Sequence, residues 1–402
     1  MDTLTIVLSL ILLLVLAVIL TDLLPLVWRW FSRIHIGRWD CNKEWQAASE
    51  KKLLAQLKKT PRLPLSDQTR LTFIERIKGE YSNATLLQWQ QAALLLGANG
   101  LCEREKSQRE IEGFIASKIG ADGDWQKFVP APETAMLAFA ILSSYAVDKE
   151  KCRPAMDRAA ELLFDLAKQS GTIPYNNRIP EIRFVDTVGM ICPFLTKYAI
   201  EYDCLEALLL AKKQIDEYAA SGLHEKFPVP VHCFSLGSGA PLGIYGWGRG
   251  CGWWAYGLMD SYLTLMHSEM PPDDKGCGNH KVVILSDEFK TSLLDEMTSF
   301  AKTLVAFQMH SGAWDRQVFL MGSGESSATA MLAWFMKKMY RITSEETYIQ
   351  SYEKAMAYLR GATRRYGSVD FAQGDTKGIG FYCAKLDAMP AAQGFTVRCF
   401  VE

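Results

Sequence analysis

The sequence predicts an all-α protein, and three observations support that fold class. Helical periodicity recurs almost throughout the chain from about residue 67 onward. Strand-like alternation is rare and short, and the longer connections between the expected helices hold most of the Gly, Trp and special polar residues. About a dozen helices with such loops favour a closed toroid of helical hairpins. A solenoid of helical repeats is the alternative, although the sequence has no fixed repeat period.

The overall composition excludes several functional classes. Of the 402 residues, 49% are hydrophobic and 22% are charged, which is typical of an ordinary globular protein. The net charge of −1 lacks the positive excess of a nucleic-acid-binding protein, so no nucleic-acid partner is expected. The ten Cys form no CxxC pair and none has a His at zinc-ligand spacing. A structural metal site is therefore not expected.

An uncharged segment, TLTIVLSLILLLVLAVILT, occupies residues 3–21. Its length approaches the roughly 20 residues that a bilayer-spanning helix needs. A signal peptide is the alternative, but it would need a basic start and a small-residue cleavage site, and this chain begins Met1-Asp2 and continues DLLP at 22–25. We therefore predict an uncleaved transmembrane anchor over residues 1–27.

The residues after this segment predict its orientation in the membrane. Trp28, Trp30 and Trp39 suit the membrane–water interface. Basic residues follow the segment and none precedes it. The basic residues that follow are Arg29, Arg33 and Arg38. The positive-inside rule then predicts a single-pass protein of the inner or plasma membrane, with its main domain in the cytoplasm.

Residues 28–66 are expected to form a juxtamembrane linker. Residues 43–66 are polar and Lys-rich, which indicates a surface helix followed by a Pro-broken connection. This helix could lie on anionic lipid, but a solvated linker helix is the simpler interpretation. The main domain then covers residues 67–402. Its expected helices are 67–79, 84–97, 107–119, 133–146, 153–169, 187–201, 204–220, 253–267, 287–309, 326–341 and 344–362.

Two carboxylates near helix starts are candidates for acid–base chemistry. Asp186 lies in FVDTVGMICPFLTKYA, where a helix N-cap is the simpler interpretation and Pro193 predicts a kink. A proton donor at neutral pH would need burial or a nearby anion to raise its pKa, because the helix dipole favours the ionised form. Glu133 begins a very apolar helix. It is either a solvated first-turn acid or a second carboxylate that faces Asp186 across a cavity.

The most unusual segment is HCFSLGSGAPLGIYGWGRGCGWW, from His232 to Trp254. Gly costs roughly 1 kcal/mol per interior helix position, so we expect a loop that leads into a helix starting near Trp253. The aromatic rings and the Arg249 fork suit an acidic sugar. The alternative is a bent loop whose aromatic residues fill a core. Two later segments, 311–335 with a capping Glu325 and the Gly-rich 372–395, share this loop character.

Four motifs occur in a fixed order along the main domain. D-x-x-x-M-x-x-P-F-L is matched at 186–195, and G-W-x-R-G-x-G-W at 246–253. E-T-S-A-T-A-M appears at 325–331 with Ser326 in place of Thr, and P-x-x-Q-G at 390–394. In this order they resemble the unsaturated glucuronyl and rhamnogalacturonyl hydrolases, the six-hairpin glycosidases of families 88 and 105. The resemblance covers roughly residues 67–402.

This resemblance implies an (α/α)6 barrel with its site at one end, and a reaction that needs no metal, nucleotide or other cofactor. The substrate is an oligosaccharide whose terminal uronate carries a C4=C5 double bond. A carboxylic acid protonates C4, water adds at C5, and the resulting hemiketal opens and releases the rest of the sugar. Because this is hydration rather than displacement, the usual two-carboxylate rules for stereochemistry do not apply.

The resemblance also implies roles for individual residues. Asp186 matches the general acid and base, and Glu133 lies near where the family carries a second acid. Arg249 would hold the uronate or shape the pocket. The other implied substrate-binding residues are His232, Trp247, Trp253 and Trp89.

Two departures from the family pattern keep a second function open. Cys251 stands where the family commonly has Asn, and Ser235 replaces a frequent acid. Both positions are expected to line or support the pocket, so substrate choice could differ. The alternative is a non-catalytic glycan-binding or scaffold protein of a membrane polysaccharide assembly system. The retained Asp186 and Arg249 favour the enzyme.

Overall fold

The computed structural model describes residues 2–61, 73, 77, 87–101, 105–267, 280–376 and 378–401. The N-terminal apolar helix consists of α1 (Thr3–Val18), a π-helical turn (Ile19–Leu23) and α2 (Leu24–Ser32). The helices that follow are α3 (Asn42–Lys58), α5 (Gln88–Asn99), α6 (Glu105–Ala116), α7 (Glu133–Leu142), α8 (Arg153–Ala167), α9 (Val185–Tyr202), α10 (Leu205–Gly222), α11 (Gly248–Met266), α12 (His280–Ala306), α13 (Ser326–Thr343), α14 (Glu346–Gly361) and α15 (Pro390–Val401).

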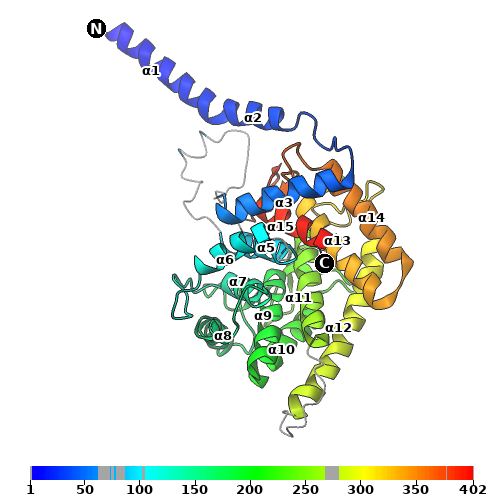
Figure 1. Cartoon of the computed structure of the whole chain (residues 1–402). Helices are drawn as coiled ribbons and strands as arrows, with labels where there is room; N and C mark the ends of the chain where they lie inside the picture. The colour runs from blue at the N-terminus through cyan, green and yellow to red at the C-terminus, as the bar shows by residue number, and fades with distance from the viewer. Residues whose placement is uncertain are drawn as a thin grey trace.

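Six helices of the described chain form a closed inner ring. They contact one another in the order α5, α7, α9, α11, α13 and α15, and α15 returns to α5. The helices α3, α6, α8, α10, α12 and α14 pack around this ring (Figure 1). Inner helices such as α7 are buried at every position, which explains their lack of a polar face. The predicted (α/α)6 barrel is therefore confirmed.

Glycine lets the inner helix α11 approach its neighbours α9 and α13 closely. A Cβ added to Gly189 of α9 would lie 2.6 Å from the carbonyl oxygen of Trp253, and one on Gly252 of α11 would lie 2.6 Å from Met331 Sδ. The expectation that α11 starts near Trp253 is wrong, because the helix already begins at Gly248. Close helix packing outweighs the weak helix propensity of these glycines.

Helix α3 differs from the solvated linker helix that the sequence predicted. Trp45, Leu53 and Leu57 are buried, and α3 packs against α5, α6 and α15. Gln393 of α15 also donates from Nε2 to the Ser49 carbonyl oxygen at 3.0 Å. The helix therefore belongs to the outer layer of the barrel. Its apolar positions are too widely spread among Lys and Gln to reveal this from composition.

The remaining helix predictions have mixed outcomes. The helix expected over 67–79 falls outside the described residues, apart from residues 73 and 77. The other expected helices each coincide with an observed one, with shifted ends. The C-terminal part of segment 372–395, expected to be a loop, instead starts α15, the last helix of the inner ring.

Short strands line the end of the barrel where the inner helices begin. The strands β1 (Ile182–Phe184), β2 (Val231–Ser235) and β3 (Pro241–Tyr245) form an antiparallel sheet with Arg183 opposite Phe234. The strands β4 (Ala372–Gln373) and β5 (Leu386–Asp387) pair as a hairpin. Much of the segment from His232 is thus a strand pair rather than an irregular loop.

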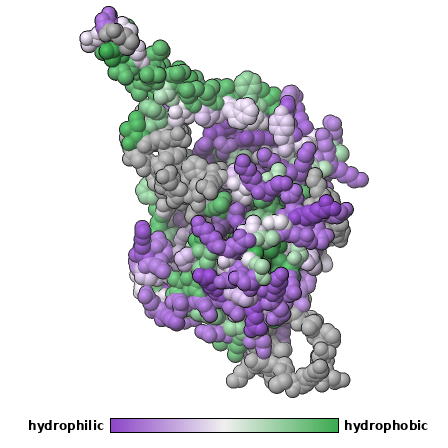
Figure 2. Space-filling view, turned by 60° about the vertical axis from the view of Figure 1, so that its left-hand side comes forward, coloured by the Kyte–Doolittle hydropathy of each residue, from purple (hydrophilic) through white to green (hydrophobic). Residues whose placement is uncertain are grey.

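The N-terminal helix projects away from the barrel (Figure 1) and is apolar over its exposed length (Figure 2). The stretch Thr3–Ser32 is 30 residues long, none of its apolar window is buried, and it is long and apolar enough to cross a membrane. A signal sequence would pass the same test. The structure thus agrees with a membrane-spanning helix in length and composition.

Candidate active site

A cavity of about 190 Å³ opens where several inner helices begin. Trp89, Asp186 and Arg249 each occupy the second position of an inner helix, α5, α9 and α11. Helix starts that share one end of the barrel therefore bring these three side chains into one pocket. The predicted residues that line this pocket are Trp89, Asp186, His232, Arg249 and Trp253.

Asp186 is the best-placed proton donor in this pocket. Burial raises the pKa of its carboxyl to about 7, an effect that Arg249 opposes and that Asp375 and Glu133 reinforce. Its Oδ2 is buried and has no hydrogen-bond partner. The N-cap of α9 is Phe184, and no side chain caps this helix. Asp186 therefore does not serve as the cap that its position suggested.

His232 and Tyr382 stand beside Asp186. The His232 Nε2 lies 3.8 Å from Asp186 Oδ2, and its Nδ1 lies 3.0 Å from the Tyr382 hydroxyl. The Ile244 amide donates to that hydroxyl at 3.1 Å, which leaves the phenolic proton for Nδ1. Burial, with a contribution from Arg249, lowers the pKa of His232 to about 4. The ring is therefore neutral at pH 7, and we infer that its Nε2 proton faces Asp186.

Arg249 and Trp247 hold the segment that follows β4. The Arg249 guanidinium donates to the carbonyl oxygens of Gln373 and Gly374 at 2.6 and 2.9 Å. The Trp247 Nε1 donates to Gln373 Oε1 at 2.9 Å. Trp247 is buried and does not line the pocket, so its predicted stacking on a sugar finds no support in the cavity lining. Trp253 and Trp89 do line the pocket, and their rings form an edge-to-face pair with centroids 5.6 Å apart.

Asp375 lines the same pocket, and the sequence analysis missed it. Burial raises the pKa of its carboxyl to about 6; Arg249 opposes this rise and Glu133 reinforces it. Asp375 directly follows the two carbonyl groups that Arg249 binds. The available signal was a single acid between two glycines in segment 372–395. Nothing in the local pattern relates that acid to Asp186.

Glu133 does not line this cavity but a neighbouring one of about 520 Å³, and Trp89 lines both. That Glu133 faces Asp186 across a cavity stays a prediction. Glu133 is buried at the start of α7 and accepts a hydrogen bond from the Tyr175 hydroxyl at 2.7 Å. Tyr175 does line the pocket. Its hydroxyl has a pKa raised well above the usual value, first by burial and then by Glu133 and Asp186. Glu133 thus acts on the pocket through Tyr175 and through its own charge.

The two departures from the family pattern lie away from the cavity. Cys251 is fully buried in α11 and Ser235 ends β2, and neither lines the pocket. The alternative expectation that these two residues support the pocket without lining it stays a prediction. Among the described residues, no group of three or more His, Cys, Asp or Glu is placed to hold a metal ion.

Comparisons with solved structures give the fold of this chain. A possible member of family GH105 from Salmonella enterica serovar Paratyphi A matches with a TM-score of 0.68 and 18% identity, over 89% of this chain and 92% of that chain. A possible GH105 member from Klebsiella pneumoniae matches with a TM-score of 0.69 and 17% identity, over 90% and 93%. An unsaturated glucuronyl hydrolase specific for heparin matches with a TM-score of 0.63 and 14% identity, over 89% and 96%.

No family model matches the sequence, and no curated protein matches it in a sequence comparison. At 14–18% identity the solved structures establish a shared fold. The matches span 89–90% of this chain and 92–96% of the three solved chains. The resemblance that the motifs predicted is therefore confirmed in the fold, and the activity must be argued from the pocket.

Proposed function

We propose that this protein is a glycoside hydrolase that removes an unsaturated uronyl residue from an oligosaccharide by hydrating its C4=C5 double bond. The observation that carries the proposal is the state of Asp186. Its side chain is 14% exposed, its carboxyl has a pKa raised to about 7, and its buried Oδ2 has no hydrogen-bond partner. A general acid that works near neutral pH needs this combination. The fold shared with unsaturated glucuronyl hydrolases supports the substrate class.

The proposed reaction follows from the chemistry of the vinyl ether. Asp186 donates its proton to C4, and positive charge develops at C5 and the ring oxygen. Water adds to C5 while the ionised Asp186 accepts a proton from it. The hemiketal opens by breaking the bond between C5 and the ring oxygen, and the hemiacetal at C1 releases the remaining sugar as an alcohol. Each proton that Asp186 gives is thereby returned.

The other pocket residues are assigned to substrate binding and to the electrostatic attraction of the uronate. The pocket is smaller than the roughly 300–1,000 Å³ of sites for drug-sized ligands, which suits a single sugar ring. Trp89 and Trp253 supply apolar walls. We assign to Arg249 the electrostatic attraction of the uronate, because its charge faces both pocket carboxyls while its hydrogen bonds hold the Gln373 segment. His232, neutral at pH 7, would orient the attacking water or the carboxyl of Asp186.

We further propose that residues 1–27 form an uncleaved anchor and that the enzyme is a single-pass protein of the inner or plasma membrane, with its barrel in the cytoplasm. The length, apolarity and exposure of the helix support this assignment, as do the arginines that follow it. The mass of the protein isolated from membranes tests the anchor. A mature chain that lacks the apolar segment would identify a signal peptide instead.

The decisive experiment follows the ultraviolet absorbance of the C4=C5 chromophore in a panel of unsaturated uronyl disaccharides. Full-length protein in detergent is compared with Asp186→Asn. The control is Asp216→Asn, which removes a carboxylate paired with Lys212 on the surface of α10. We expect loss of absorbance with the wild type and the control, and none with Asp186→Asn.

Two results would contradict the proposal. Equal loss of absorbance with Asp186→Asn would mean that another group is the acid. No loss with the folded wild type on any substrate would end the hydration proposal. Saturable binding of the same sugars would then favour the non-catalytic glycan-binding alternative.

A further inference from the structure

The C-terminal hairpin forms one wall of the pocket. We call residues Ala372–Asp387, from β4 to β5, the pocket hairpin. Its strands pair Ala372 with Asp387 and Gln373 with Leu386, so its base lies at the edge of the barrel. Between the strands, the chain contributes Asp375 to the pocket lining and Tyr382 to the hydrogen bond with His232.

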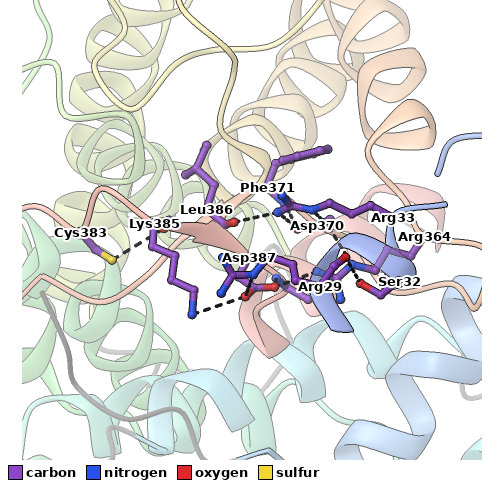
Figure 3. Close-up of polar contacts among 11 residues, drawn as sticks. Arg29, Ser32, Arg33, Arg364, Asp370, Phe371, Cys383, Lys385, Leu386 and Asp387 are labelled. Atoms are coloured by element: carbon purple, nitrogen blue, oxygen red, sulfur yellow. Dashed lines mark hydrogen bonds and ion pairs between the residues drawn. The ribbon is translucent and has the colours of Figure 1, made fainter. Parts of the chain in front are cut away.

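Helix α2, which continues the apolar N-terminal helix, binds the base of this hairpin (Figure 3). Arg33 donates to both carboxylate oxygens of Asp370, at 2.8 and 3.0 Å, and to the Leu386 carbonyl oxygen at 2.9 Å. Arg29 forms an ion pair with Asp387 at 2.9 Å. The two arginines are four residues apart, which places them on one face of the helix. Both ends of the hairpin are thereby held from the same helix.

The barrel holds the same two carboxylates from the other side. Arg364 donates to Asp370 and to Asp387, each at 2.7 Å. Asp370 is fully buried, and although burial acts to raise its pKa, hydrogen bonds from Arg33 and Arg364 lower it. Without Arg33, a buried carboxylate would lose its two-point partner from α2. The contact is therefore a bridge between α2 and the barrel rather than a solvated surface pair.

The residue that joins Asp370 to β4 is also constrained. Phe371 adopts a φ of 58°, a left-handed conformation that is strained for a residue with a side chain. The Arg33 guanidinium lies 4.6 Å from the centre of its ring, and its carbonyl oxygen accepts from the Ser326 amide at 3.0 Å. Surrounding contacts thus impose the direction in which the hairpin leaves Asp370.

The connection after α2 also contacts the barrel. The Gly37 amide donates to the Thr363 carbonyl oxygen at 2.9 Å, and a Cβ on Gly37 would lie 2.6 Å from the Gly361 carbonyl oxygen. Arg360 of α14 donates to the side chain of Asn42 at 3.0 Å and also to the Trp39 carbonyl oxygen. Trp28 and Trp30, which flank Arg29 in α2, are exposed, 76% and 65% accessible.

We propose that Arg29 and Arg33 are positioning residues for the pocket, which make the N-terminal helix part of the support for the wall that carries Asp375 and Tyr382. The helix then does more than tether the barrel, because its end fixes the base of the pocket hairpin. The kinetic consequence rests on the proposed function, whereas the structural link between helix and hairpin does not.

The test uses full-length protein in detergent with Arg29→Ala/Arg33→Ala. The matched control is Arg38→Ala, which removes an arginine of the same segment whose side chain contacts His35. Hydrogen–deuterium exchange of amides 374–385 should be faster in the double variant and unchanged in the control. Hydration of the unsaturated disaccharide should fall in kcat/KM on the order of ten- to a hundredfold in the double variant, because a displaced wall misaligns the site. Its pH profile should shift to lower pH, since Asp375 would act less on Asp186.

Each result decides a separate point. Unchanged exchange of 374–385 in the double variant overturns the inference. Faster exchange with unchanged kcat/KM and pH profile also overturns it, because the arginines would then hold the hairpin without positioning the pocket. If the double variant does not fold, Arg33→Lys must show faster exchange than the wild type, and equal exchange overturns the inference. If the wild type hydrates no substrate, the proposed function fails and exchange alone decides the link.

Discussion

The pocket has two walls that are held in different ways. The helical wall consists of the starts of α5, α9 and α11, whose positions follow from packing within the inner ring. The opposite wall is the pocket hairpin, which has two short strands and depends on side chains of distant segments, including Arg249, Glu325 and Arg33. Substitutions in the helical wall should therefore lower the reaction rate or the stability of the whole fold. Substitutions that affect the hairpin should alter the pocket with a modest loss of stability.

Asp186→Asn gives the largest expected effect, because it removes the proposed acid from the helical wall. We expect kcat for hydration of the unsaturated disaccharide to fall about 10²–10⁴-fold, the usual contribution of a general acid. The fold should persist, since Asn has the same size and needs no charge in a buried site. Steady-state kinetics beside circular dichroism measure both.

The same variant tests the raised pKa through stability. Because the folded pKa of Asp186, about 7, lies above its model value of 3.8, its stabilising contribution is complete below pH 3.8 and is lost as the pH rises through 7. Asp186→Asn lacks this loss, so it should gain stability relative to the wild type between pH 4 and 8. If urea titrations give the same pH dependence of the free energy of unfolding for both proteins, the pKa of Asp186 is not raised.

Gly189→Ala tests the close packing behind the helical wall. The new Cβ would lie 2.6 Å from the Trp253 carbonyl oxygen and 2.9 Å from its Cα, and backbone cannot move aside cheaply. We expect a loss of about 1–3 kcal/mol in the free energy of unfolding. Gly113→Ala in α6 is the control, because no atom lies within 4 Å of the Cβ that this substitution adds. That variant should gain about 0.5–1 kcal/mol from helix propensity.

Trp247→Phe tests how the hairpin wall is held. The change removes the donor to Gln373 Oε1 and leaves that buried oxygen without this bond, which costs about 1–3 kcal/mol. Trp125→Phe is the control, since its Nε1 donates to the Ala155 carbonyl oxygen away from the pocket. Both variants should lose similar stability in urea titrations. Activity should fall several-fold in Trp247→Phe alone, and an equal fall in both would contradict the positioning role.

Asp375→Asn should give the smallest effect, a shift in pH dependence. The negative charge of Asp375 contributes to the raised pKa of Asp186. Its removal should lower that pKa, so the fall in activity on the alkaline side should move to lower pH. The kcat/KM profile of the variant measures this shift. A profile that moves to higher pH would show that the two carboxyls do not interact as the structure indicates.

The sequence was sufficient for much of the helical wall. Apolar periodicity located α7, α9 and α13 and placed Asp186 at the start of a helix, whereas Arg249 was expected in a loop ahead of its helix. The hairpin wall was largely missed, because Asp375 follows a glycine in a segment without periodicity. Glu133 and Trp247 were expected at the pocket, yet neither lines this cavity, and they hydrogen-bond to Tyr175 and Gln373. A motif shows that a residue type is required, but it does not show whether that residue touches the ligand or supports one that does.

By itself the sequence determined the fold class, the apolar N-terminal helix and the positions of most helices along the chain, because hydrophobic periodicity and segment length are local properties. The tertiary structure alone decided that α3 joins the barrel and that α11 starts at Gly248. It also decided that Arg29 and Arg33 hold a hairpin more than 330 residues away in the chain. These three features depend on which surfaces meet after folding. Burial in the folded protein also raises the pKa of Asp186, which no local sequence pattern specifies.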